Sequence, residues 1–285
     1  MISISTIKTA QKAKKIDPSH LKNYQIIGHS YIQLKNYKKA HSIFTAGIEN
    51  LPNNGAIYTE KGRLFMLEEK YLEALHVFED GVLKCPNYAS NYYWASKIYA
   101  TSTEKIWALF YGELFMNLEP DSYRTDEISK VLYRTLKNNI IISKDSMSVN
   151  LSKDMNVPSS KIDSNYVSFG QDVVENTVQE IIREDSIQVI TIESIIQLKR
   201  ALVKKLNQSQ INPYPTHLLF QYYKKLIESG DFEAYNHWIY MMGNIDEFKS
   251  WEQHHTTKWV HFQNWMVQQE FTINPQDHFH SSSFQ

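Results

Sequence analysis

Histidine offers this 285-residue chain its widest chemistry, because an imidazole can bind a metal, move a proton or change charge near neutral pH. Eleven are present, and the densest group is His254, His255 and His261. No carboxylate stands four residues away on a common helical face to complete a metal site, so we interpret this group as a solvated helix boundary. His278 and His280 lie in a polar tail and offer no better site.

Other reactive side chains also lack the partners that catalysis needs. Cys85 is the single cysteine and directly precedes Pro86, a position that favours a small buried hydrophobic residue over a nucleophile. The paired carboxylates Glu68-Glu69 and Glu79-Asp80 fall on predicted exposed helix faces. Neither a Gly-rich phosphate loop nor a Gly-x-Ser-x-Gly elbow occurs. We therefore expect no enzyme, no cofactor and no metal.

Composition excludes several classes of partner. The 30 basic residues nearly balance 31 acidic ones, so no overall charge favours nucleic acid. Aromatic residues make up 13%, with 18 Tyr and 6 Trp against 9 Gly and 8 Pro, which favours helices packed through large side chains. No stretch nears the roughly 20 apolar residues of a membrane span. The first 15 residues lack the apolar core of a signal peptide, which indicates a cytoplasmic protein; a missing upstream leader would make it periplasmic or secreted.

A 34-residue repeat orders the N-terminal half. The spacing joins Tyr24 with Tyr58, Gly28 with Gly62, Ala40 with Ala74, Phe44 with Phe78 and Gly47 with Gly81, and it relates Pro18, Pro52, Pro86 and Pro120. Each proline ends one helix pair and starts the next well. A glycine inside a helix costs roughly 1 kcal/mol, which is understandable where a neighbouring helix passes close by.

This register resembles that of the tetratricopeptide repeat family. The signature positions hold Tyr24, Ile27, Gly28, Tyr31, Ala40, Phe44, Gly47 and Pro52 in one repeat, and Tyr58, Gly62, Phe65, Ala74, Phe78, Gly81 and Pro86 in the next. The third is looser, because Gly112 stands where an aromatic residue is usual and Phe115 where a small one is usual. The resemblance implies a right-handed helical solenoid. Other stretches (107–119, 124–132 and 232–239) are similar to parts of larger tetratricopeptide-containing proteins of Bacteroidetes bacteria, whose role is unknown.

We expect an all-α fold in which the solenoid precedes a C-terminal helical region. The expected parts are a partial repeat or cap helix (1–20), three repeats with a capping helix (21–138), a Ser-rich linker or loop (139–170), the C-terminal helical region (171–273) and a disordered tail (274–285). Alternation of Met147, Val149 and Leu151 with polar residues leaves room for one short strand in the linker. Thr125 is the expected N-cap of the capping helix.

The resemblance also implies where a ligand would lie, because the first helix of each pair lines the concave groove of such a solenoid. His29, Arg63 and Lys97 are 34 residues apart and would form a basic ladder there. A second row would hold Gln25, Thr59 and Tyr93, with Trp94 beside the last. Cationic donors beside aromatic rings favour a protein or peptide ligand, acidic or ending in a C-terminal carboxylate.

Family members that bind chaperone tails use a clamp of Lys, Asn and Arg. The corresponding positions here are Gln25, His29, Glu60, Ser90 and Trp94, which argues against those tails. Three readings stay open: a non-enzymatic interaction module, an enzyme or metal-binding protein with its site in the His- and aromatic-rich C-terminal half, and a self-associating scaffold. The simplest alternative for the ladder is a solvated face that carries ordinary charges.

Overall fold

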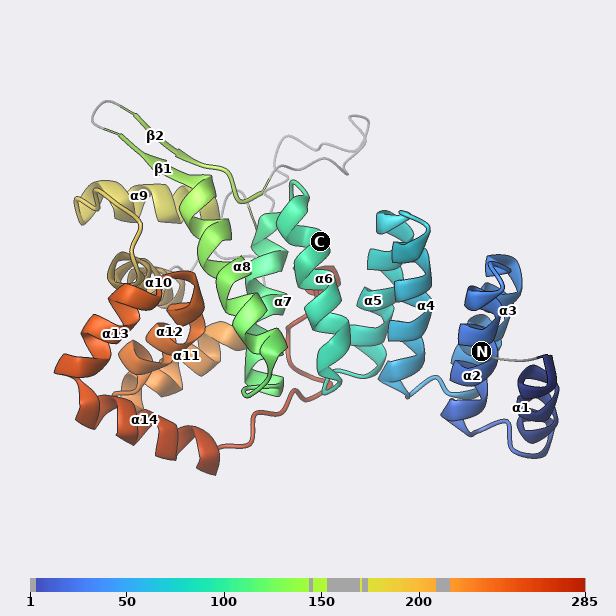
Figure 1. The fold of residues 1–285 in the computed structure, drawn as a ribbon. Helices are drawn as coiled ribbons and strands as arrows, with labels where there is room; N and C mark the ends of the chain where they lie inside the picture. Colours follow the sequence, from blue (N-terminus) through green and yellow to red (C-terminus); the bar gives the residue numbers. More distant parts are fainter. Residues whose placement is uncertain (1–3, 144–145, 153–169, 171–173, 209–215, 285) are drawn as a thin grey trace. The chain divides into compact units, whose positions relative to one another are not determined.

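The computed structural model describes residues 4–143, 146–152, 170, 174–208 and 216–284 (Figure 1). Over this part of the chain the regular structure is fourteen α-helices, short 3-10 turns and one pair of three-residue strands. The expected all-α class is therefore confirmed. The chain divides into two compact units, residues 1–95 and 96–285. This division falls inside the third expected repeat, whereas the sequence grouped residues 21–138 together.

The first unit consists of helices that pack on their neighbours in the chain. They are α1 (Ile4–Ile16), α2 (Leu21–Gln33), α3 (Tyr37–Asn50), α4 (Gly55–Leu67), α5 (Tyr71–Lys84) and the beginning of α6 (Ala89–Thr101). Helix α1 packs on α2, α2 on α3, α3 on α4 and α4 on α5. The arrangement is that of successive helix pairs, as the 34-residue spacing predicts.

The same hydrogen bonds recur one repeat apart. The Tyr24 hydroxyl donates to the carbonyl of Pro18 at 2.8 Å, and the Tyr58 hydroxyl donates to the carbonyl of Pro52 at 2.9 Å. Each bond ties the first helix of a pair to the proline turn before it. Because donors and acceptors share the 34-residue spacing, sequence repetition is matched by repetition of structure.

The predicted close approach at the helical glycines is also present. A Cβ atom on Gly28 would lie 2.3 Å from the ring of Phe44, and one on Gly62 would lie 2.3 Å from the ring of Phe78. The aromatic residue of each second helix therefore packs directly on the backbone of the first. In the third pair the order is reversed, since Gly112 on the second helix packs against Ser96 and Leu132.

The second unit contains the end of α6 and ten further elements of regular structure, with two 3-10 turns. They are α7 (Lys105–Leu118), α8 (Tyr123–Asn139), β1 (Ile140–Ile142), β2 (Met147–Val149), α9 (Asn176–Glu184), α10 (Ile192–Gln208), α11 (Leu218–Ser229), α12 (Phe232–Tyr240), α13 (Ile245–His254), α14 (Thr256–Gln268), η2 (Met241–Gly243) and η3 (Ser281–Phe284). Helix α12 lies at the centre, since it packs on α8, α10, α11 and α14. The expected single strand has a partner: β1 pairs antiparallel with β2, and Ile140 faces Val149.

Helix α8 begins earlier than predicted. Its N-cap is Ser122, whose hydroxyl accepts hydrogen bonds from the backbone N–H groups of Arg124 and Thr125. The predicted cap, Thr125, lies inside the helix, where its hydroxyl donates to the carbonyl of Glu119. Both residues are good caps, and the sequence pattern alone did not separate them.

Residues 274–284 differ from the expected disordered tail. The N–H of Leu218 donates to the carbonyl of His278 at 2.8 Å, and the N–H of Ser281 donates to the hydroxyl of Tyr111 at 3.0 Å. Phe279 and Phe284 are buried. These two aromatic residues supply the apolar area that holds an otherwise polar segment in place. Most of the expected linker, residues 153–169, lies outside the described residues.

Candidate binding surface

Glu60 joins the first helices of two successive pairs. This carboxylate on α4 accepts a hydrogen bond from the Gln25 amide at 2.8 Å and lies 2.7 Å from His29 Nε2, both on α2. Burial by itself would raise the pKa of Glu60, but the bonds from His29 and Gln25 and the charge of Arg63 outweigh it and lower that pKa. An ionised carboxylate only accepts hydrogen bonds, so the His29 ring donates through Nε2.

Arg63 lies on α4 nearly one turn beyond Glu60. Its side chain is exposed, and its positive charge contributes to the lowered pKa of Glu60. His29, the matching residue of the preceding repeat, keeps 45% of its side chain exposed. The two cationic positions predicted for the first unit therefore both reach solvent around one shared carboxylate.

Thr59 is engaged within the unit. Its hydroxyl donates to Asn91 Oδ1 at 2.8 Å, and the Asn91 amide donates in turn to the carbonyl of Gly55 at 3.2 Å. Both residues are buried. The bonds connect α4 to the start of α6, so this member of the predicted second row holds adjacent helices together.

Tyr93 and Trp94 form an aromatic group at the end of the first unit. Their rings meet edge to face with centroids 5.0 Å apart, and the Trp94 ring stacks on Phe78 at 6.2 Å and 13°. Tyr93 is buried, and Trp94 is partly buried. Trp94 thus continues the row of rings that starts where Phe78 covers Gly62.

Lys97, the third member of the predicted ladder, belongs to the second unit. Its ammonium group donates to Glu127 Oε1 on α8. His29 and Lys97 therefore share a feature that the sequence did not predict: each pairs with a carboxylate on the first helix of the following pair. Neighbouring repeats of opposite charge at these positions were hidden because Glu60 and Glu127 do not lie in the 34-residue register.

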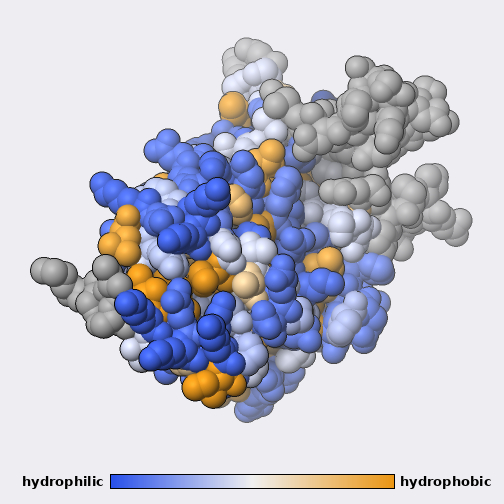
Figure 2. Space-filling model, turned by 90° about the vertical axis from the view of Figure 1, so that its right-hand side faces the viewer, coloured by the Kyte–Doolittle hydropathy of each residue, from blue (hydrophilic) through white to orange (hydrophobic). Residues whose placement is uncertain are grey.

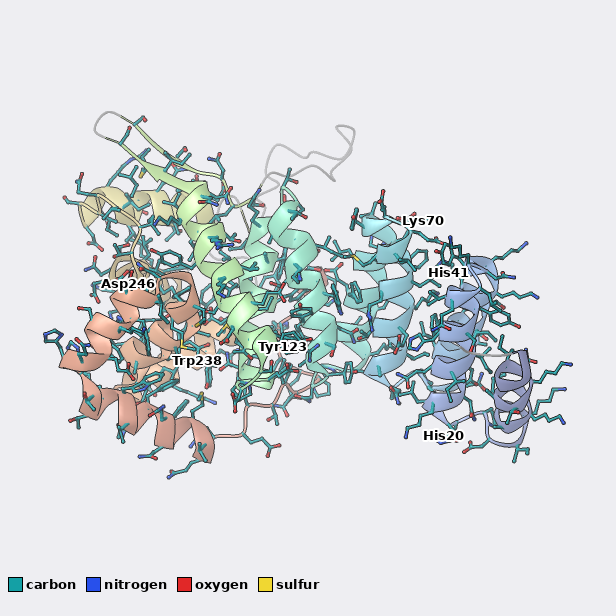
Figure 3. All side chains as sticks on the ribbon, in the orientation of Figure 1. His20, His41, Lys70, Tyr123, Trp238 and Asp246 are labelled. Atoms are coloured by element: carbon teal, nitrogen blue, oxygen red, sulfur yellow. The ribbon has the colours of Figure 1, made fainter. Side chains whose placement is uncertain are left out.

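A second carboxylate bridges the hairpins of the first unit. Glu68, directly after α4, lies 3.3 Å from His41 Nε2 on α3 and accepts a hydrogen bond from Lys70 at 2.7 Å. The bond from Lys70 is the main cause of the lowered pKa of Glu68. Figure 3 labels His41 and Lys70 at corresponding ends of neighbouring hairpins. Seen from the side of α1, the surface is mostly hydrophilic, with hydrophobic residues in small separate groups (Figure 2).

The histidines of the C-terminal half bind separate partners. His254 and His255 each contact a backbone carbonyl of their own helix, whereas His261 Nδ1 lies 2.8 Å from the buried carboxylate of Asp231. The ring of Trp251 stacks between His237 and His255. Over the described part of the chain, no three His, Cys, Asp or Glu side chains are placed to share a metal ion.

A buried polar network in the second unit was not predicted. Lys199 on α10 donates to both carboxylate oxygens of Glu113 on α7 at 2.9 Å, and the Tyr235 hydroxyl on α12 donates to Oε1 at 2.8 Å. Asn117 donates to that hydroxyl at 2.7 Å. A glutamate inside the apolar run of α7 was the available signal, but its partner lies 86 residues away.

Comparison with known proteins adds no relative. No family model matches the chain, and no curated protein matches it significantly. Among the helices that the structure describes, none combines the length and apolar character needed to cross a bilayer.

Proposed function

We propose that the chain is a non-enzymatic interaction protein of the tetratricopeptide type, a right-handed helical solenoid that binds a protein or peptide segment through the first helices of its repeats. The supporting observation is the recurrence of structure at the sequence period. Identical hydrogen bonds at Tyr24 and Tyr58, and identical ring contacts at Gly28 and Gly62, place equivalent positions of α2 and α4 in equivalent surroundings. A surface repeated in this way suits an extended or helical ligand with its own regular spacing.

The proposed contact surface consists of Gln25, His29, Glu60 and Arg63, with Trp94 at its end. Arg63 is the exposed cation, and His29 is shared with Glu60. An acidic segment would gain a charge-assisted hydrogen bond from Arg63 and compete with Glu60 for His29. The combination favours a segment in which an acidic side chain meets Arg63 and a donor meets Glu60, rather than a uniformly acidic tail.

Selection of peptides from a random displayed library on the full chain tests this function. Affinities of the selected peptides are then measured by fluorescence anisotropy for the wild type and two variants. Arg63→Glu reverses the charge on the proposed surface, and Lys38→Glu makes the same reversal on the second helix of a pair. We expect Arg63→Glu to weaken binding about tenfold, which is about 1.4 kcal/mol, and Lys38→Glu to leave it unchanged. Equal affinities for both variants would place the binding surface elsewhere.

A further inference from the structure

An apolar cavity of about 70 Å³ lies within the second unit, among α7, α8, α9, α10 and α11. Most of its lining is aliphatic or aromatic, as at Leu109, Val178 and Leu198. Glu113 and Lys199 are the two charged side chains among the described residues that line it. The volume is about half that of an engineered 150 Å³ apolar cavity that binds benzene, so a guest would have about three or four non-hydrogen atoms.

The charges at the wall of the cavity restrict the guest to a neutral molecule. Lys199 and Glu113 are in contact at 2.9 Å, and their opposite charges cancel. An anionic guest would face the Glu113 carboxylate, and a cationic guest would face the Lys199 ammonium group. Either would also lose its hydration in an apolar chamber, which is costly without a dedicated partner.

Lys199 supplies the reactive atom. Its side chain is 12% exposed, and its ammonium group lies over the ring of Tyr223, 4.2 Å from the centroid. Burial lowers the pKa of Lys199, an effect that the charge and hydrogen bonds of Glu113 oppose. Lysines in hydrophobic pockets serve as nucleophiles for carbonyl compounds because the neutral amine is easier to reach there than in water.

Glu113 is placed to move the protons that such a reaction requires. Its carboxylate touches the amine, and the Tyr235 hydroxyl holds Oε1 in position. Because Asn117 donates to the Tyr235 oxygen, the phenolic hydrogen points to Glu113. Burial raises the pKa of Tyr223, Tyr235 and Tyr240, so the phenols around the pair stay neutral. Glu113 is then the group next to the amine that can accept its proton.

We propose that this cavity takes up a small neutral aldehyde or ketone of about two to four carbons, and that Lys199 captures it as an imine. This site does not depend on the binding function of the repeats. Lys199 first gives a proton to Glu113, and its nitrogen lone pair then forms a bond to the carbonyl carbon as the C=O double bond opens. A proton moves from nitrogen to oxygen, which gives a neutral carbinolamine.

In the second half of the reaction, Glu113 returns its proton to the carbinolamine hydroxyl, which leaves as water. The nitrogen lone pair forms the C=N bond, and the product is a protonated imine beside the ionised Glu113. One carbonyl compound and one ammonium group have become one iminium group and one water, with no oxidant or reductant. The charge pair at the wall is preserved, which keeps the buried Glu113 balanced throughout.

Reductive trapping tests the proposal on the full chain. The protein is treated with limiting propionaldehyde and sodium cyanoborohydride, and propylated lysines are quantified by peptide mass spectrometry. Lys205 is the internal reference, because it lies on the same helix and also pairs with carboxylates, those of Glu180 and Glu184, but is more exposed. We expect Lys199 to be propylated about tenfold more than Lys205, the ratio that one pKa unit gives. Labelling of Lys199 equal to or below that of Lys205 would overturn the proposal.

Two further measurements separate capture in the cavity from general amine reactivity. Val178→Phe fills the cavity from α9 without changing a charge, and xenon occupies apolar cavities without reacting. Each should bring Lys199 labelling down to the level of Lys205 or below, while Lys205 labelling stays constant. Glu113→Gln should also lower it; if that variant fails to fold, the xenon experiment on the wild type still decides. Labelling of Lys199 that is indifferent to both xenon and Val178→Phe would show that the cavity is not the site.

Discussion

At Gly62 the backbone of α4 touches the ring of Phe78, and Gly28 meets Phe44 in the same way. A hydrogen is the only substituent that fits at these two positions, although glycine is a poor helix former. The helix propensity lost at each glycine is therefore exchanged for close packing between the two helices of a pair. The repeated glycines in the sequence are explained by this contact.

Gly62→Ala tests that contact. Alanine would stabilise an isolated helix by about 1 kcal/mol, but the new Cβ would lie 2.3 Å from the Phe78 ring. We expect the clash to dominate and to lower the free energy of unfolding by about 1–3 kcal/mol, measured by urea denaturation. The double variant Gly62→Ala/Phe78→Leu should recover part of the loss. A Gly62→Ala protein more stable than the wild type would contradict the packing described here.

Glu60 predicts a dependence of stability on pH. Its pKa is lowered in the folded state, chiefly because the bonds from His29 and Gln25 overcome the effect of burial. A lowered carboxyl pKa contributes stability that is fully present above the unfolded pKa of about 4.3 and is lost as pH falls through the folded pKa. Glu60→Gln should be less stable than the wild type by about 1–2 kcal/mol at neutral pH, and the two should converge in acid. Urea midpoints from pH 7 to pH 3 measure this, and a constant difference would exclude Glu60 as the cause.

The turn between the two helices of a pair has the same strained residue in both described repeats of the first unit. Lys35 and Glu69 have positive φ angles of 54° and 60°, a region that costs a residue with a side chain roughly 1–2 kcal/mol. Backbone bonds close the turns alike, from Asn36 to Tyr31 and from Lys70 to Phe65. The turn geometry is therefore kept without the glycine that would be the usual choice.

Lys35→Gly should stabilise the protein at the level of this turn. Glycine relieves the positive φ but adds backbone entropy to the unfolded chain, so we expect a net gain of about 0.5–1 kcal/mol in the free energy of unfolding. Ser42→Gly, in the exposed middle of α3, is the matched control and should lower it by about 0.5 kcal/mol. Thermal denaturation of both variants gives the comparison. Loss of stability in both would mean that Lys35 makes contacts that outweigh its strain.

The elements were predictable from the sequence where a periodic signal was strong. The helix pairs and the glycine contacts followed from the 34-residue spacing. The pairing of His29 with Glu60 did not, because the register relates residues of one kind and is silent about neighbours 31 residues apart. Strand β1 was missed because Ile140–Ile142 continues the apolar pattern of α8. The Lys199–Glu113 pair joins helices far apart in the chain, and a single sequence carries no signal for such pairs.

Across the second unit, the last described residues belong to the core. Phe284 packs against Trp107 on α7, with ring centroids 5.7 Å apart, and against His217 before α11, at 5.5 Å. Burial lowers the pKa of His217 to about 3, so this imidazole is neutral under ordinary conditions and behaves as an apolar plate. The contacts connect the end of the chain with the beginning of the unit.

Phe284→Ala should therefore destabilise the second unit, although the residue lies next to the end of the chain. Removal of a buried phenyl ring costs about 3–5 kcal/mol in well-packed cores, and we expect about 3 kcal/mol here because a terminal segment can partly relax. Near-ultraviolet circular dichroism during urea unfolding follows the loss. Val267→Ala, at a side chain that is 87% exposed, should change stability by less than about 0.5 kcal/mol. Equal effects of the two variants would mean that Phe284 is not part of the core in solution.

The bonds from Tyr24 to Pro18 and from Tyr58 to Pro52 also fix a unit of length for evolution and for engineering. A block of 34 residues copied in register would find its tyrosine opposite a proline carbonyl, its glycine opposite a phenylalanine ring and its turn already closed. A block shorter or longer by a few residues would rotate these partners away from one another on every helix that follows. Gene duplication in steps of this size could lengthen the chain without inventing a new contact, and other step lengths could not.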